Sequence, residues 1–61
     1  MFQEGDDVIA LDPTDVRSEH YHMFLGFIDE VYDDGTYLVR DQDDNHFIIA
    51  ECDLVRDSDY L

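Results

Sequence analysis

The chain has 61 residues, of which 44% are hydrophobic, so it can form one small domain that buries only about 60% of the surface of its unfolded form. That size excludes a large catalytic cleft, and we expect no enzyme and no cofactor. Its 17 Asp and Glu residues are opposed by three Arg, a net charge of −14, which excludes direct binding to nucleic acid or to an anionic membrane. We expect a positively charged partner, with an acidic surface suited to high salt as the alternative.

Cellular location follows from the cysteine count and the N-terminus. Cys52 is the single cysteine, so an internal disulfide framework is excluded and a reducing compartment is expected. No apolar run approaches the length of a membrane span, and the acidic start MFQEGDD lacks the plan of a signal peptide. We expect a cytoplasmic protein.

The first third of the chain predicts one strand and one loop. The segment VIALD, residues 8–12, is typical of a short strand, and Pro13 ends it. The polar stretch 14–20 is too short for an independent helix, so it is predicted to be a loop.

A long second strand is predicted over residues 22–32, HMFLGFIDEVY. Side chains alternate across a strand, which places Phe24, Gly26 and Ile28 on one face. Met23, Leu25 and Phe27 share the other face. Gly26 indicates a bend or a close approach of the backbone.

Turn residues divide the remaining chain into three further strands. Asp-Gly in DDG, residues 33–35, predicts a tight two-residue hairpin turn. DQDDN, residues 41–45, predicts the next turn. The strands are TYLVR, HFIIAE and the short closing segment DLV, at residues 36–40, 46–51 and 53–55. Five short strands without a helix predict an all-β domain over residues 1–61, a small barrel whose closure removes exposed edges.

Several phrases carry a resemblance to a known family. GDDVIAL, FLGFIDEV, DGTYLVRDQDD and IIAECDLV follow one another along nearly the whole chain. In this order they resemble a Tudor domain of the SH3-like barrel class, most closely the Tudor repeats of the SAGA-associated histone reader. The resemblance implies a five-stranded SH3-like (Tudor-like) barrel that holds methylated lysine or arginine in a cage of aromatic rings beside a carboxylate.

The resemblance also implies particular cage residues. Tyr21 or Phe24 would stand at the family's aromatic position before the second strand, and Asp43 or Asp44 would be the acidic wall. Two further aromatic positions of the family are replaced, one by Asp12 and one by the pair Arg40 and Asp41. Because a barrel this small uses its large apolar side chains as core, Phe24, Phe27, Tyr37 and Phe47 are expected in the core. Tyr21 and Tyr32 flank polar segments and are expected at the surface.

Metal and nucleophile patterns are incomplete. Asp41, Asp43 and Asn45 follow the spacing of calcium ligands, but His46 and Cys52 stand where that loop needs Gly and Glu, so no metal site is expected. His20 and His22 are expected to be exposed loop histidines. Cys52 lacks an orienting group, and we expect it to be a buried or half-buried structural cysteine.

Two functions are consistent with the sequence. The first is a stand-alone acidic inhibitor, of the kind a phage encodes, that mimics the phosphates of DNA and blocks the nucleic-acid groove of a basic protein in a bacterial host. Its binding surface would lie near two turns that the hairpin brings to nearby regions, and would comprise Asp29, Glu30, Asp33, Asp34, Asp41, Asp43 and Asp44.

The second function is a Tudor-type reader of basic or methylated-lysine peptides, nuclear in location, that uses Tyr21 and Tyr32 as cation receptors and the acidic residues for steering. Dimerisation through the edges of the barrel is left open.

Overall fold

Alternating apolar residues, divided by Gly and Asp turns, produce the five strands that the sequence predicts. The computed structural model describes residues 1–60. Its strands and two short 3₁₀ turns are β1 (Asp7–Ala10), β2 (Phe24–Val31), β3 (Thr36–Asp41), β4 (His46–Ala50), η1 (Glu51–Asp53), β5 (Leu54–Arg56) and η2 (Asp57–Asp59). No helix in this part of the chain is long and apolar enough to cross a membrane.

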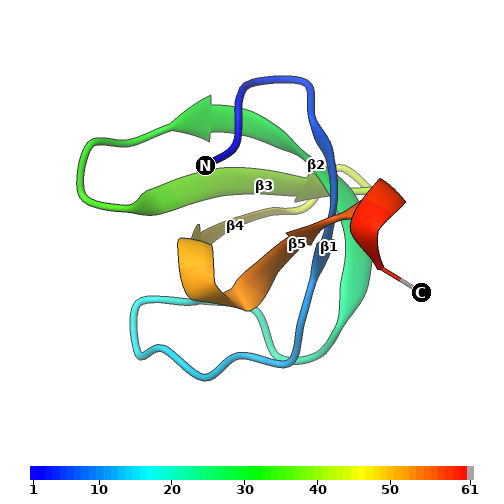
Figure 1. Cartoon of the computed structure of the whole chain (residues 1–61). Coiled ribbons are helices and arrows are strands. Elements are labelled where there is room, and N and C mark those ends of the chain that lie inside the picture. The colour runs from blue at the N-terminus through cyan, green and yellow to red at the C-terminus, as the bar shows by residue number, and fades with distance from the viewer. Residues whose placement is uncertain (61) are drawn as a thin grey trace.

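The strands form a single antiparallel sheet in the order β4-β3-β2-β1-β5, which curls around the core (Figure 1). The all-β class is confirmed, and the arrangement is consistent with a small SH3-like barrel. The expected closure is absent, however, because β4 and β5 remain as edges. The loop between β1 and β2 covers the β4 edge: Glu19 N–H donates to the Ile48 carbonyl at 2.8 Å, and Ala50 N–H donates to Ser18 Oγ at 3.0 Å. A covered edge is protected against pairing with another chain.

β2 joins the two halves of the sheet. Its first residues pair with β1, and from Gly26 onward it pairs with β3, with a bulge between Ile28 and Glu30. Gly26 takes part in both pairings, and a Cβ atom there would clash with the carbonyl oxygen of Arg40. Of the two alternatives predicted for Gly26, a bend or a close approach of the backbone, the close approach is confirmed.

The core lies on the concave side of the sheet. Phe24 and Phe47 pack partly buried against it, and its buried members are Phe2, Val8, Ala10, Ile28, Tyr37, Val39, Ile49 and Leu54. The core position of Tyr37 is confirmed. That of Phe27 is wrong, because its ring lies on the outer face beneath the guanidinium of Arg40, 4.5 Å from the ring centroid. Phe2 is a core residue that the sequence did not reveal; it packs edge to face on Tyr37, with ring centroids 5.4 Å apart.

The two turns on either side of β3 differ in geometry. Tyr32 N–H donates to the Thr36 carbonyl at 3.1 Å, so three residues, not the predicted two, form the β2–β3 turn. Within it only Gly35 is left-handed, with φ +85°. In the β3–β4 turn the left-handed residue is Asp44, with φ +66°. Asp tolerates this region better than most residues other than Gly.

Candidate functional site

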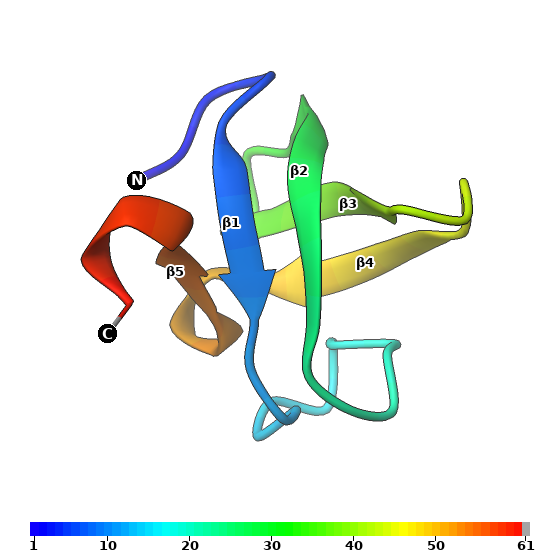
Figure 2. The same cartoon turned by 90° about the vertical axis from the view of Figure 1, so that its right-hand side faces the viewer.

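The predicted acidic residues lie in two separate groups. The β2–β3 turn and the β3–β4 turn are at opposite ends of β3 (Figure 2). Since β3 has 6 residues, the turns are about 20 Å apart. Glu30, Asp33 and Asp34 lie toward one end, and Asp41, Asp43 and Asp44 toward the other. The expectation that the hairpin brings the two turns together is wrong, because one hairpin strand separates them.

Two of the predicted acids hold their own turns in shape. Asp34 Oδ1 accepts hydrogen bonds from the N–H and the hydroxyl of Thr36, and these bonds lower its pKa. Asp41 Oδ1 accepts from the N–H groups of Asp43 and Asn45 at 2.8 and 2.9 Å. Burial would raise the pKa of Asp41, but these hydrogen bonds outweigh it and lower the pKa. Both carboxylates are therefore charged and structurally engaged.

Asp29 and Asp44 are paired with cations of the chain itself. Arg40 lies between them, with its Nε 3.6 Å from Asp29 Oδ2 and its Nη1 3.2 Å from Asp44 Oδ1. His46 Nε2 is 3.0 Å from the same Asp29 oxygen. Because Arg40 partly neutralises both carboxylates, they are poorer ligands for a partner than unpaired acids.

Three predicted acids remain without such bonds: within residues 1–60, no hydrogen bond or ion pair involves the side chains of Glu30, Asp33 and Asp43. The cations, in contrast, are all engaged. The N-terminal ammonium group and the three arginines pair with Glu51, Asp15, Asp29, Asp44 and Asp6 at distances of 3.1 to 3.6 Å. The outward charge of the described chain is thus carried by carboxylates.

An aromatic and acidic hollow, hereafter the cleft, opens beside the β3–β4 turn. Its volume is about 270 Å³, and its lining residues are His20, Tyr21, His22, Phe24, Asp41, Asp43, Asn45 and Phe47. They come from the β1–β2 loop, the first residue of β2, the last residue of β3, the β3–β4 turn and β4. The pairing of Gly26 with Asp41 and of Val39 with Phe47 brings these segments together.

The aromatic side of the cleft is a connected set of rings. Phe24 and Phe47 have centroids 5.3 Å apart at an interplanar angle of 45°, and His20 meets Phe24 edge to face at 5.7 Å. Tyr21 is 88% exposed, so its ring is free to close over a bound group. The predicted surface position of Tyr21 is confirmed.

His20 differs from its expected position. It is 3% exposed, and its Nε2 hydrogen-bonds to the Leu11 carbonyl at 2.5 Å, whereas His22 is exposed as expected. The prediction for His20 was wrong because the β1–β2 loop folds back and supplies a backbone acceptor.

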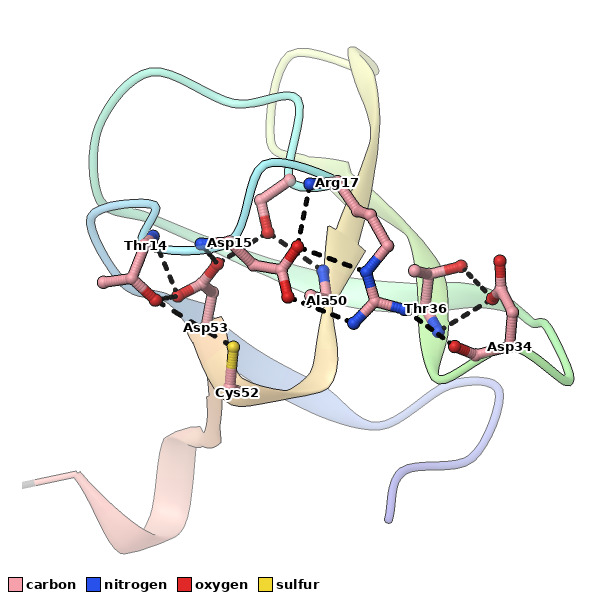
Figure 3. A network of polar contacts seen from close by, with 9 residues as sticks. Thr14, Asp15, Arg17, Asp34, Thr36, Ala50, Cys52 and Asp53 are labelled. Atoms are coloured by element: carbon pink, nitrogen blue, oxygen red, sulfur yellow. Dashed lines mark hydrogen bonds and ion pairs between the residues drawn. The ribbon is translucent and has the colours of Figure 1, made fainter.

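Asp53 anchors the loop that carries Tyr21 (Figure 3). It is 1% exposed and accepts hydrogen bonds of 2.6 Å from both the Thr14 and Ser18 hydroxyl groups. The N–H groups of Thr14 and Asp15 donate to it as well. Burial would raise the pKa of Asp53, but these four donors outweigh burial and lower the pKa to about 2.

The turn η1 explains why the burial predicted for Cys52 is wrong. It directs Asp53 inward to the loop and leaves its neighbour Cys52 exposed, so the expected buried or half-buried cysteine is wrong. In a strand, too, Cys52 and Asp53 would face opposite sides. The hydrogen-bond donors of the β1–β2 loop decide that Asp53 is the one that faces inward.

Tyr32 does not contribute to the cleft. It follows β2 directly, whereas Tyr21 precedes that strand, so the two tyrosines lie at opposite ends of β2. Tyr32 is half-buried; burial raises its pKa, and the charge of Glu30 adds to the effect. The two predicted cation receptors therefore cannot hold one side chain.

The sequence did not reveal that Phe47 lines the cleft. Phe47 was expected in the core, and the ring does pack against the core. Because Phe47 lies near the start of β4, one side of the ring also faces the cleft. Alternation along a strand indicates which face of the sheet a side chain is on, but not whether that side chain lies at the end of the strand where the cleft opens. Asp44, one of the two candidates for the acidic wall, is not among the residues that line the cleft.

The chain was compared with protein-family models, with curated proteins and with solved structures, and none matches it. Within residues 1–60, no three His, Cys, Asp or Glu side chains are grouped so that they could hold a metal ion. The cleft and the distribution of charge are therefore the features from which function is inferred.

Proposed function

We propose that this protein is an acidic binding module that engages a basic protein surface. The observation that carries the proposal is that the positive groups of the chain are paired within it while several carboxylates are not. The arginines and the N-terminal ammonium group are engaged by carboxylates of the chain, whereas Glu30, Asp33 and Asp43 are free to meet an external cation. A surface of this kind attracts cationic partners over distances up to the Debye length and increases their rate of association.

In its narrower form, the proposal is that the partner is a nucleic-acid-binding protein whose access to DNA is blocked. Duplex DNA presents a negative charge about every 1.7 Å along its axis, and a rigid sheet that displays carboxylates at both ends of β3 offers an anionic alternative to it. The separation of about 20 Å between the two acidic turns means that a partner must contact them through two distinct basic patches.

Affinity capture tests this proposal. The immobilised protein is incubated with a native lysate at low salt, washed at rising salt and then eluted with duplex DNA, and the eluted proteins are identified by mass spectrometry. We expect basic nucleic-acid-binding proteins that duplex DNA releases. Retention of nothing above the lowest salt concentration would contradict the proposal.

A matched pair of variants separates a specific surface from general acidity. One combines Glu30→Gln, Asp33→Asn and Asp43→Asn. The control removes the same number of charges from exposed acids elsewhere and combines Glu4→Gln, Asp57→Asn and Asp59→Asn. We expect the first variant to lose the partner and the control to retain it. Equal retention by both variants would show that net charge alone is responsible.

The cleft favours a second candidate function, the reading of a basic or methylated peptide. The rings of Tyr21, Phe24 and Phe47 stand beside the carboxylates of Asp41 and Asp43. Aromatic faces attract a cation by about 0.5 to 2 kcal/mol, and neighbouring carboxylates add Coulomb attraction. A lysine or arginine side chain is the ligand whose chemistry fits this combination.

Calorimetric titration with a lysine peptide, its trimethylated form and an uncharged analogue tests the second candidate. We expect both cationic peptides to bind and Tyr21→Ala to weaken them, since this exposed side chain can be removed without opening the core. Equal affinity for the methylated and unmethylated peptides would remove methyl recognition and leave general recognition of a cation.

A further inference from the structure

We infer that the basic segment bound by the cleft carries an apolar side chain next to its cationic one, and that Met23 and Leu25 receive this apolar side chain. The inference rests on the proposed binding of a basic partner and adds to it the chemistry of the neighbouring residue.

A second hollow adjoins the cleft and continues it along β2. Its volume is about 260 Å³, and it is lined by His22, Phe24, Leu25, Asp41, Gln42 and Asp43. His22, Phe24, Asp41 and Asp43 also line the cleft, so the two hollows form one depression. A segment whose cationic side chain enters the cleft can therefore extend through the second hollow and over Leu25.

The floor of the second hollow continues into an exposed apolar strip. Leu25 is 50% exposed and Met23 is 41% exposed, although both belong to a folded strand or its immediate approach. Leu25 pairs with Ile9 of β1, which is 3% exposed, and Ile9 pairs in turn with Val55 of β5. Paired residues lie side by side on one face of the sheet, so Leu25 is the exposed end of an apolar row whose other members, Ile9 and Val55, are more covered.

The C-terminal turn bounds the strip on its far side. The Tyr60 hydroxyl lies 3.9 Å from the Met23 sulfur, and the Tyr60 side chain is itself 44% exposed. Apolar surface is thereby confined between Tyr60 and the acidic β3–β4 turn. An occupant needs an apolar group for the strip and a cation for the acids, one or two positions apart along its chain.

Charge complementarity selects a basic segment as the occupant in preference to a second copy of the chain. Each copy carries a net charge of −14, and the strip adjoins Asp41 and Asp43, so two copies placed face to face would repel each other. A basic segment is attracted by the same carboxylates. Burying half of a leucine side chain adds roughly fivefold to the affinity.

Peptides of equal charge test the inference. Fluorescence anisotropy is used to compare an arginine peptide whose neighbouring residues are all glycine with peptides that carry leucine one or two positions from the arginine. We expect the best leucine peptide to bind about fivefold tighter than the glycine peptide. Leu25→Ser is expected to abolish this difference while leaving binding of the glycine peptide unchanged.

Val31→Ser is the matched control, because Val31 is a similarly exposed residue, 43%, at the other end of β2. Thermal unfolding of both variants checks that they are folded. Equal affinity for all cationic peptides, or loss of the leucine preference in Val31→Ser as well, would overturn the inference while the proposed binding function stands.

Two other outcomes also count against the inference. If no cationic peptide binds, the proposed reading of basic peptides fails, and the apolar subsite fails with it. If sedimentation reveals a dimer that Leu25→Ser dissociates, the occupant of the strip is a second copy of the chain. Binding of a neutral leucine peptide as tightly as the arginine-leucine peptide would show that the strip is not coupled to the cleft.

Discussion

The Ser18 hydroxyl group donates a hydrogen bond of 2.6 Å to Asp53 Oδ2 and accepts one of 3.0 Å from Ala50 N–H. One side chain thus joins a buried carboxylate of η1 to the edge strand β4. Because Ser18 belongs to the loop that carries Tyr21, the same contact that protects the sheet edge also positions the cleft. Stability and binding are therefore linked through Asp53.

Replacing Asp53 is expected to destabilise the protein. Asp53→Ala leaves the Thr14 and Ser18 hydroxyl groups and two backbone N–H groups without their buried acceptor, at a cost of about 2 to 3 kcal/mol. Urea unfolding measures this cost, and Asp59→Asn, which removes an exposed charge, is the control expected to stay within about 0.5 kcal/mol. Equal unfolding midpoints for Asp53→Ala and Asp59→Asn would contradict the anchoring role of Asp53.

Stability is expected to depend on the charge of Asp53 at acid pH. Its pKa is lowered from 3.8 to about 2 in the folded protein. Since the folded state binds this proton less readily, the carboxylate stabilises the fold above pH 3.8, and this contribution is lost as the pH falls toward 2. The difference in unfolding free energy between the wild type and Asp53→Asn should therefore shrink over that interval. A difference that stays constant from pH 6 to pH 2 would exclude this titration.

Gly26→Ala is expected to be more damaging than Gly35→Ala. A Cβ atom at Gly26 would meet the Arg40 carbonyl oxygen in the paired strand, so the sheet must shift, at a cost of about 1 to 3 kcal/mol. At Gly35 there is open space, and the cost comes from its left-handed φ of +85°, about 1 to 2 kcal/mol. Thermal unfolding compares the two variants, and a lower melting temperature for Gly35→Ala than for Gly26→Ala would contradict the close approach.

Added salt is expected to stabilise the fold. With a net charge of −14 in a domain 25 × 22 × 22 Å across, carboxylates repel one another across most of its width at an ionic strength of about 0.01 M, where the Debye length is about 30 Å. Raising NaCl toward 1 M shortens the Debye length to about 3 Å and screens this repulsion. We expect the melting temperature to rise by several degrees, and to rise less in the variant that combines Glu30→Gln, Asp33→Asn and Asp43→Asn. A melting temperature that falls with salt would mean that the internal ion pairs outweigh the repulsion.

The sequence by itself determined the five strands and the loop that precedes β2. These features depend on neighbours along the chain, because side chains alternate in a strand and Gly or Asp residues mark the turns. The sequence also marked Gly26 as a bend or a close approach, and the contact with the Arg40 carbonyl oxygen in the paired strand decided between the two. The core position of Tyr37 followed from the need of so small a domain for large apolar side chains.

Only the tertiary structure decided which side chains face inward and which residues from different elements lie together. It separated the two acidic turns by the length of β3, turned Asp53 inward and Cys52 outward, and buried His20 against the Leu11 carbonyl. It also brought Phe47 to the cleft. The physical reason is that each of these outcomes depends on donors, acceptors and packing partners supplied by segments distant along the chain, which local periodicity does not specify.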